Sequence, residues 1–109
     1  MIIYTKFKIK NYIAITIYPF IIINHNYKGD ETLINHEKIH IEQQRELLWI
    51  GFFVLYMLEF IFRFFQYQNW KEAYLSISFE KEANFNENNI LYLSFRKNYS
   101  FIKYYKTVF

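Results

Sequence analysis

The sequence predicts a mixed α+β fold in which a small N-terminal sheet is followed by helices. Isoleucine, tyrosine and phenylalanine, which suit a pleated surface, dominate the first part of the chain. Residues 33–46 combine sparse apolar positions with many polar ones, as in a helix with one open face, and residues 47–65 form a long apolar segment. At 109 residues the chain has room for one domain, which we place at residues 1–109.

Two N-terminal segments are predicted to be strands that form an antiparallel hairpin or a small sheet. Residues 4–10 alternate imperfectly between apolar and polar side chains, and residues 12–24 are rich in Ile, Tyr and Phe. Pro19 lacks a backbone N–H, so the second segment is either an edge strand or is interrupted there. An interruption leaves residues 20–24 as a short strand of their own.

Charge and cysteine content narrow the classes of protein that fit. The net charge is +3 and the lysines are spread along the chain, whereas a nucleic-acid binder is expected to show a clustered basic stripe. The chain has no Cys, so any metal must be held by His and carboxylates. Three lysines before an apolar run resemble a signal peptide, but no small-residue cleavage site follows. We therefore expect a cytoplasmic protein, with membrane association as an option.

Capping residues place the start of the first helix. Asp30 or Thr32 can cap a helix over residues 33–46, and Glu31 lies near its positive end. Polar residues fill most positions between the few apolar ones, so this helix is expected to present one face to something other than core.

The C-terminal third is predicted to be mainly helical. Residues 69–89 form two shorter helices, the first capped by Asn69 and the second by Ser76 or Ser78. The tail, residues 90–109, alternates aromatic and basic residues. It is either a final strand or a packed extension.

Residues 47–65 are predicted to form a long apolar helix, which Gly51 either kinks or separates from the preceding one. Glu59 precedes Arg63 by four residues, the better orientation for an ion pair on a helix. A helix that is apolar on all sides must be buried in something. Three alternatives stay open: the chain's own core, a membrane surface with or without partial insertion, and a homodimer face.

The segment His36-Glu37-Lys38-Ile39-His40 has the H-E-x-x-H pattern on the first predicted helix. Residues four apart lie about 6 Å along the same face, so two imidazoles can converge on one zinc ion. Glu37, beside the first ligand, can then act as a general base toward zinc-bound water. The alternative is a polar helix face that carries two solvated histidines.

A catalytic zinc site needs a third protein ligand and leaves one position for water. His25 lies before the helix, and two glutamates, Glu80 and Glu82, lie downstream of it. On one helix these glutamates project about 200° apart, so they cannot both face the metal.

The H-E-x-x-H motif followed some tens of residues later by E-K-E-A-N at residues 80–84 resembles the gluzincins, which carry E-x-x-A-[D/N] on a second helix. The short length resembles the minimal version called minigluzincins, and residues 19–84 are similar to a group of small bacterial proteins common in Bacteroidetes. The resemblance implies that Glu80 is the third zinc ligand. Glu82 is then expected to be a solvated helix charge.

The resemblance implies two further features of the site. Where the gluzincin pattern has Asp, this chain has Asn84, whose amide oxygen can accept a hydrogen bond from a ligating His without supplying charge. Strand 20–24 is expected to form the upper rim of the cleft and to pair with an extended substrate. The alternative is an ordinary edge strand covered by the chain's own tail.

These features predict a zinc metallopeptidase that hydrolyses peptide bonds, with His36, His40 and Glu80 as ligands and Glu37 as base. The rival is a catalytically inactive zinc-binding protein with a membrane-associated regulatory or interaction role. A third hypothesis is an interaction module without metal. The expected partners are a peptide or protein substrate and, through residues 47–65, a membrane surface or a second copy of the chain.

Overall fold

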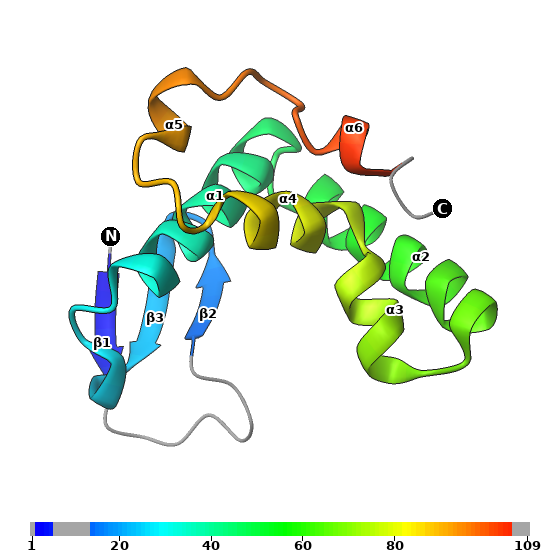
Figure 1. Ribbon diagram of the computed structural model, residues 1–109, viewed down its shortest axis with the longest axis horizontal. Helices are drawn as coiled ribbons and strands as arrows, with labels where there is room; N and C mark the ends of the chain where they lie inside the picture. The colour runs from blue at the N-terminus through cyan, green and yellow to red at the C-terminus, as the bar shows by residue number, and fades with distance from the viewer. Residues whose placement is uncertain (1, 6–13, 106–109) are drawn as a thin grey trace.

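The structure, a computed structural model, describes residues 2–5 and 14–105. It has a three-stranded sheet followed by helices, so the predicted α+β class is confirmed (Figure 1). The strands are β1 (Ile2–Thr5), β2 (Ala14–Ile17) and β3 (Phe20–Asn24), and a 3-10 helix, η1 (His25–Tyr27), follows them. The helices are α1 (Glu31–Glu46), α2 (Ile50–Tyr67), α3 (Trp70–Ser76), α4 (Ser78–Asn86), α5 (Tyr92–Phe95) and α6 (Ile102–Tyr105).

Strand β3 lies at the centre of the sheet, between β1 and β2. β2 and β3 form an antiparallel hairpin in which Ile17 pairs with Phe20, so the predicted interruption at Pro19 is confirmed. The hairpin lies within the second predicted strand, however, and does not join that strand to the first. β1 instead runs parallel to β3. The first predicted strand, residues 4–10, overlaps β1 at its start, and its later residues lie outside the described part of the chain.

The central position of β3 corrects the prediction that residues 20–24 form an edge or a rim. Both edges of β3 are paired, whereas among the described residues β2 pairs with β3 alone. Ile21 and Ile23 of β3 are buried, and α1 packs across the sheet (Figure 1). Gln44 of α1 accepts a hydrogen bond from the backbone N–H of Tyr18 and donates one to the carbonyl of Thr16. These bonds fix the hairpin against α1.

Two of the predicted helix caps are confirmed, and a third is wrong. The side chains of Asp30 and Asn69 each accept a backbone N–H from the first turn of α1 and α3, as predicted. The predicted serine cap of α4 is wrong, because Ile77 occupies the capping position. Ser78 instead donates its backbone N–H and its hydroxyl to Glu59, at 2.6 and 2.7 Å. The serine thus anchors α4 to α2.

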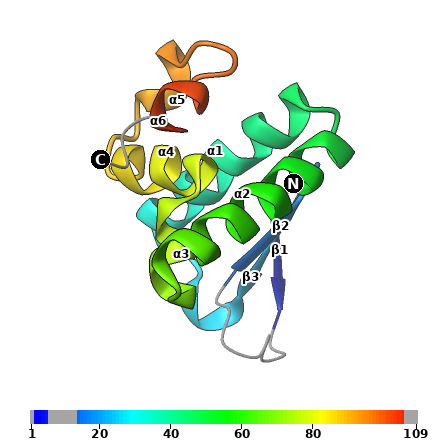
Figure 2. The same ribbon diagram turned by 90° about the vertical axis from the view of Figure 1, so that its right-hand side faces the viewer.

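Helix α4 packs beside α1, and the tail packs over α4 on the side away from the sheet (Figures 1 and 2). One apolar cluster joins α1, α4 and α5 through Ile39, Ala83 and Tyr92. A second joins α2 to α4 and to the tail, and consists of Phe52, Ile77, Phe79 and Phe101. As far as residue 105, the tail is therefore a packed extension and contains no strand.

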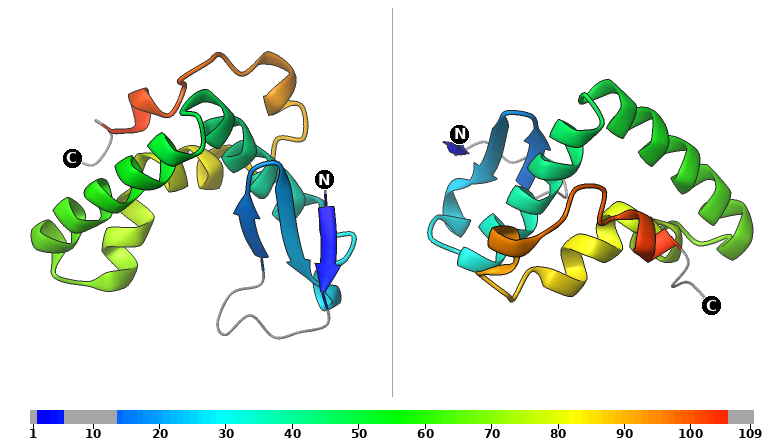
Figure 3. Two further views of the ribbon diagram at one scale, coloured as in Figure 1. Left: turned by 180° about the vertical axis from the view of Figure 1, so that it is seen from behind. Right: turned by 90° about the horizontal axis from the view of Figure 1, so that it is seen from above.

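Helices α2 and α3 run side by side and extend away from the sheet (Figures 1 and 3). The break before α2 falls at Leu48 and Trp49, which have positive φ angles of 55° and 66°, and Gly51 lies inside the helix. Of the residues of α2, all of which are described, Phe52 and Arg63 are buried. Burial of this helix in the chain's own core, one of the three alternatives, is therefore wrong.

Candidate metal centre

Helix α1 brings the two histidines of the H-E-x-x-H motif together. Four residues is close to one helical turn, so His36 and His40 lie on the same face. Their Nε2 atoms are 3.2 Å apart, and His40 is buried while His36 is half-buried. The two rings meet edge to face, with 4.9 Å between centroids. The helix alone therefore places two nitrogen ligands at one point.

Glu80 reaches the same point from α4. Its Oε1 atom lies 3.2 Å from Nε2 of His40 and 3.4 Å from Nε2 of His36. Its other oxygen, Oε2, accepts a 2.6 Å hydrogen bond from the hydroxyl of Tyr56 on α2. Glu80 is 4% exposed, so packing as well as hydrogen bonding fixes its carboxylate. Helices α1 and α4 thus supply a cluster that we call the triad, His36, His40 and Glu80, and α2 supports it through Tyr56.

The outer nitrogens of both histidines are also held. Nδ1 of His40 lies 2.8 Å from Oε1 of Gln43, and Nδ1 of His36 lies 3.0 Å from a carboxylate oxygen of Glu87. Gln43 donates through its amide nitrogen to the carbonyl of Phe79 and to Glu82, so its oxygen is the atom that faces His40. An oxygen acceptor requires the hydrogen to be on Nδ1. In each neutral ring the lone pair is then on Nε2, which points into the triad.

The triad requires a positive charge at its centre, because two imidazole lone pairs and a carboxylate face one another. Burial by itself would lower the pKa of His40, but the charge of Glu80 and its hydrogen bond outweigh burial and raise that pKa to about 9. Burial would raise the pKa of Glu80, but the charge of His40 and the hydrogen bonds it receives hold that pKa well below its usual range. Without a metal, the required charge is a proton on His40.

The spacing of the three donor atoms fits a metal ion. Two ligand atoms that lie about 2.0–2.1 Å from a tetrahedral ion are about 3.3 Å from each other. The three edges of the triad are 3.2, 3.2 and 3.4 Å long. The triad is therefore compatible with a bound metal ion without rearrangement of its ligand atoms.

Glu37 points into a cleft beside the triad. The cleft has a volume of about 330 Å³, and Glu37, His40 and Glu80 all line it. The hydroxyl of Thr16, on β2, donates a 2.5 Å hydrogen bond to Oε2 of Glu37. The rest of the lining is Ala14 and Ile15 from β2, Gln44 from α1, Phe52, Phe53 and Tyr56 from α2, and Tyr74 from α3. The cleft therefore runs from the outer strand of the sheet to the α2–α3 pair.

Three residues considered from the sequence lie elsewhere. His25 is exposed in η1 and is not part of the triad. Asn84 is exposed, on a surface shared with Lys81 and Lys103, and the histidines have other partners. Its predicted role as the outer partner of a ligand is wrong, because α4 turns this position away from α1. Glu82 points away from the triad, as predicted, but it is fully buried and is not a solvated charge.

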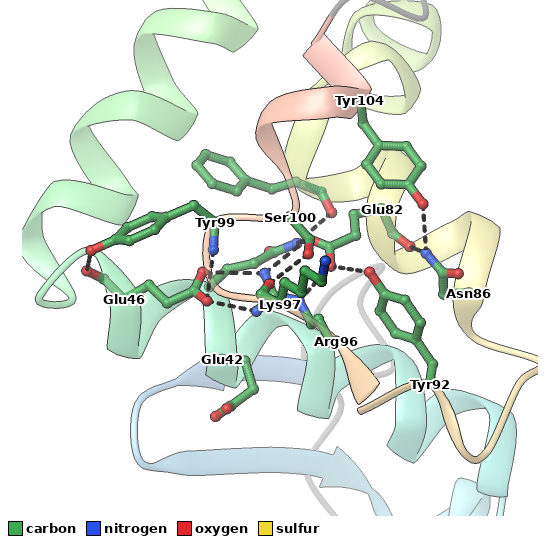
Figure 4. A network of polar contacts seen from close by, with 12 residues as sticks. Glu42, Glu46, Glu82, Asn86, Tyr92, Arg96, Lys97, Tyr99, Ser100 and Tyr104 are labelled. Atoms are coloured by element: carbon green, nitrogen blue, oxygen red, sulfur yellow. Dashed lines mark hydrogen bonds and ion pairs between the residues drawn. The ribbon is translucent and has the colours of Figure 1, made fainter. Parts of the chain in front are cut away.

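Glu82 belongs to a second buried polar cluster, shown in Figure 4. Arg96, from the tail, donates through Nε and a terminal nitrogen to Glu82, and also makes an ion pair of 2.7 Å with Glu46. Tyr92 donates its hydroxyl to Glu82 at 2.6 Å. Burial and this hydrogen bond raise the pKa of Tyr92 above its usual range, so the hydroxyl keeps its proton. We call Glu46, Glu82, Tyr92 and Arg96 the tail cluster.

The residues that support the triad and Glu37 were not predicted from the sequence. Helical spacing could have identified Gln43 and Glu87, because Gln43 lies three residues after His40 and Glu87 lies two helical turns after Glu80. No local pattern could have identified Thr16 and Tyr56, since they come from other elements and their roles depend on tertiary packing.

Comparisons of this chain with protein-family models, with curated proteins and with solved structures give no match.

Proposed function

We propose that this protein is a zinc-dependent peptidase. The observation that carries the proposal is the triangle of donor atoms with 3.2–3.4 Å edges, next to a cleft that Glu37 also lines. Two imidazole nitrogens and one carboxylate oxygen are a donor set typical of catalytic zinc. His36, His40 and Glu80 would hold the ion, which when bound supplies a Lewis acid that acidifies water and polarises a carbonyl.

In this proposal Glu37 is the general base. It directly follows His36 in the chain but does not join the triad, so its carboxylate is free for proton transfer. The hydroxyl of Thr16 occupies one of its oxygens and leaves the other to take a proton from the attacking water. Thr16 thus acts as a positioning residue that fixes the orientation of the base.

The border of the cleft favours an extended peptide as substrate. Ala14, Ile15 and Thr16 of β2 line the cleft, and among the described residues β2 is an edge strand that pairs with β3 alone, with Gln44 bonded to the carbonyl of Thr16. An unpaired strand edge offers backbone donors and acceptors to an extended chain. A peptide aligned along β2 would pass the carboxylate of Glu37.

The test compares the wild type with Glu37→Gln at matched zinc content. Both proteins are freed of metal, reloaded with zinc and assayed against a mixed library of quenched fluorescent peptides, with zinc per chain measured by elemental analysis. We expect about one zinc per chain in both, and rates about 10²- to 10⁴-fold lower in the variant, because the loss of a general base has that effect.

Three results would contradict the proposal. Less than about a tenth of an equivalent of zinc after reloading would remove the metal site, because three ligands should hold zinc tightly. Equal cleavage by both proteins would assign the activity to a contaminant. One zinc per chain with no cleavage by the wild type would instead support the inactive metal-binding protein.

A further inference from the structure

Helix α2 buries its charged side chains and exposes its apolar ones, the opposite of a helix on the surface of a water-soluble protein. Its two charged residues, Glu59 and Arg63, have side chains 8% and 1% exposed. Its large apolar residues face outward instead. Phe53, Val54, Met57, Leu58, Ile61 and Phe65 are between 39% and 72% exposed. The exposed surface of α2 therefore carries apolar side chains and no charge.

The buried charges of α2 are used inside the protein. Glu59 accepts both hydrogen bonds of Ser78, and Arg63 donates to Gln66 and to the carbonyl of Tyr105. Each polar contact therefore faces α4 or the tail, or stays within α2. Burying a charge costs free energy, and an outward position in water would avoid that cost. The inward orientation is favourable when the outer surroundings are apolar.

The width of the exposed face distinguishes lipid from a protein partner. At 100° per residue, the exposed apolar residues of α2 lie on one continuous arc of the helix circumference. Phe53 and Leu55 are at its two ends, and the arc covers about 200°. A helix that packs on a protein core needs a stripe about 100° wide. A second copy of this helix would cover such a stripe and leave the rest in water, whereas lipid chains can cover the whole arc.

The length and the ends of α2 also match a bilayer. Among the described residues, α2 is the helix long and apolar enough to cross a membrane. Its 18 residues span about 27 Å, close to the roughly 30 Å of bilayer hydrocarbon. Trp49 precedes the helix, and Tyr67 and Trp70 lie at its far end. Tryptophan and tyrosine favour the two membrane–water interfaces.

We propose that the exposed face of α2 is embedded in the hydrocarbon of a lipid bilayer. Phe52, Phe53 and Tyr56, near the start of the same helix, line the cleft beside the triad. The candidate metal centre then lies next to the membrane. This inference depends on α2 alone and does not require the proposed peptidase activity.

Tryptophan fluorescence tests the proposal directly. The chain contains two tryptophans, which flank α2 and are 43% and 70% exposed. Full-length protein in mild detergent is mixed with vesicles of phosphatidylcholine or of its dibrominated form, and the detergent is removed. We expect the protein to float with both kinds of vesicle and its fluorescence to be quenched by the brominated lipid. His36→Ala should float equally well, since the metal centre is not the anchor.

Charge substitutions on the exposed face provide the second measurement. Met57→Asp and Ile61→Asp should each lower partition into vesicles on the order of 100-fold, the cost of a charge at the centre of a membrane helix. Asn98→Asp is the matched control, because it adds the same charge at an exposed polar position outside α2 and should partition like the wild type. Circular dichroism confirms that each variant keeps its helices.

Three outcomes would overturn the proposal. One is wild-type protein that stays monodisperse and monomeric in water without lipid or detergent. Another is a stable dimer in water that does not float, which would assign the face to a second copy of the chain. The third is unchanged flotation and quenching of Met57→Asp and Ile61→Asp, which would move the membrane contact away from α2.

Discussion

Glu80 and Glu82 lie two residues apart on α4 and are 4% and 0% exposed, yet their surroundings differ in one respect. Glu82 faces Arg96, a permanent cation, which also pairs with Glu46 (Figure 4). Glu80 faces two imidazoles, which are charged only when protonated. The tail cluster is therefore held together by an arginine, whereas the triad depends on a proton or a metal ion for its positive charge.

This difference teaches how to separate a structural carboxylate from a ligand when both are buried. A buried carboxylate beside an arginine has its charge balanced by the protein itself. One that faces the lone pairs of two histidines has no such balance, and it also borders the cleft. Burial by itself would have classed the two glutamates together. The charge of the partner separates them.

The largest expected effects come from exchanging the two glutamates for glutamine. Loss of a residue that hydrogen-bonds to a metal ligand typically lowers metal affinity about 10- to 100-fold. Glu80→Gln should lower it by more than this, because the substitution removes the charge of a ligand. Glu82→Gln should lower the free energy of unfolding of the metal-free protein by about 1–3 kcal/mol, since Arg96 and Tyr92 lose a buried carboxylate while Arg96 keeps its pair with Glu46. Chelator competition and urea unfolding measure the two quantities.

The two variants serve as controls for each other. Glu80→Gln should change the unfolding free energy of the metal-free protein less than Glu82→Gln does, because Glu80 borders the cleft and its loss removes no partner from a permanent cation. If Glu82→Gln weakened metal binding more than Glu80→Gln did, the assignment of the third ligand would be wrong.

A smaller effect is expected at the link between the triad and the tail cluster. Gln43 accepts from His40 and donates to Glu82, so it connects the two. Gln43→Leu should lower metal affinity about 10- to 100-fold, because Nδ1 of His40 loses the acceptor that orients the ring. Competition with a chelator measures the change.

Gln44→Leu is the matched control for this experiment. Gln44 is the next residue and is equally buried, and its replacement loses two hydrogen bonds where that of Gln43 loses three, but the partners of Gln44 are Tyr18 and Thr16 and neither is a ligand. We expect it to destabilise the fold while leaving metal affinity nearly unchanged. Equal losses of affinity in both variants would show that Gln43 acts only through general stability.

The smallest effect is expected at Asn84. This side chain is exposed and remote from the cleft lining, so Asn84→Asp should change the free energy of unfolding by no more than about 0.5 kcal/mol. The rate of peptide cleavage should stay the same as in the wild type. A rise in rate would show that this position acts on a ligating histidine after all, contrary to the placement of α4.

The sequence by itself determined the features that depend on short-range geometry. Helical periodicity places His36 and His40 on one face and turns Glu82 away from Glu80, and these relations hold in any helix. Asp30 and Asn69 cap their helices because their side chains reach the first free N–H groups. Glu80 was predicted through the resemblance of residues 80–84 to the gluzincin pattern, and the structure brings it to the two histidines.

Tertiary structure alone decided what lies opposite each of these side chains. The ion pair of Arg96 with Glu46 joins residues 50 positions apart, and the bond from Thr16 to Glu37 joins residues 21 apart. No local pattern encodes such pairs, so Glu82 was expected in solvent and Asn84 at the site. The choice among the three alternatives for residues 47–65 (core, membrane or homodimer face) also depended on long-range packing. Apolar composition requires burial of that helix, but only the arrangement of its neighbours shows that the described residues leave most of it exposed.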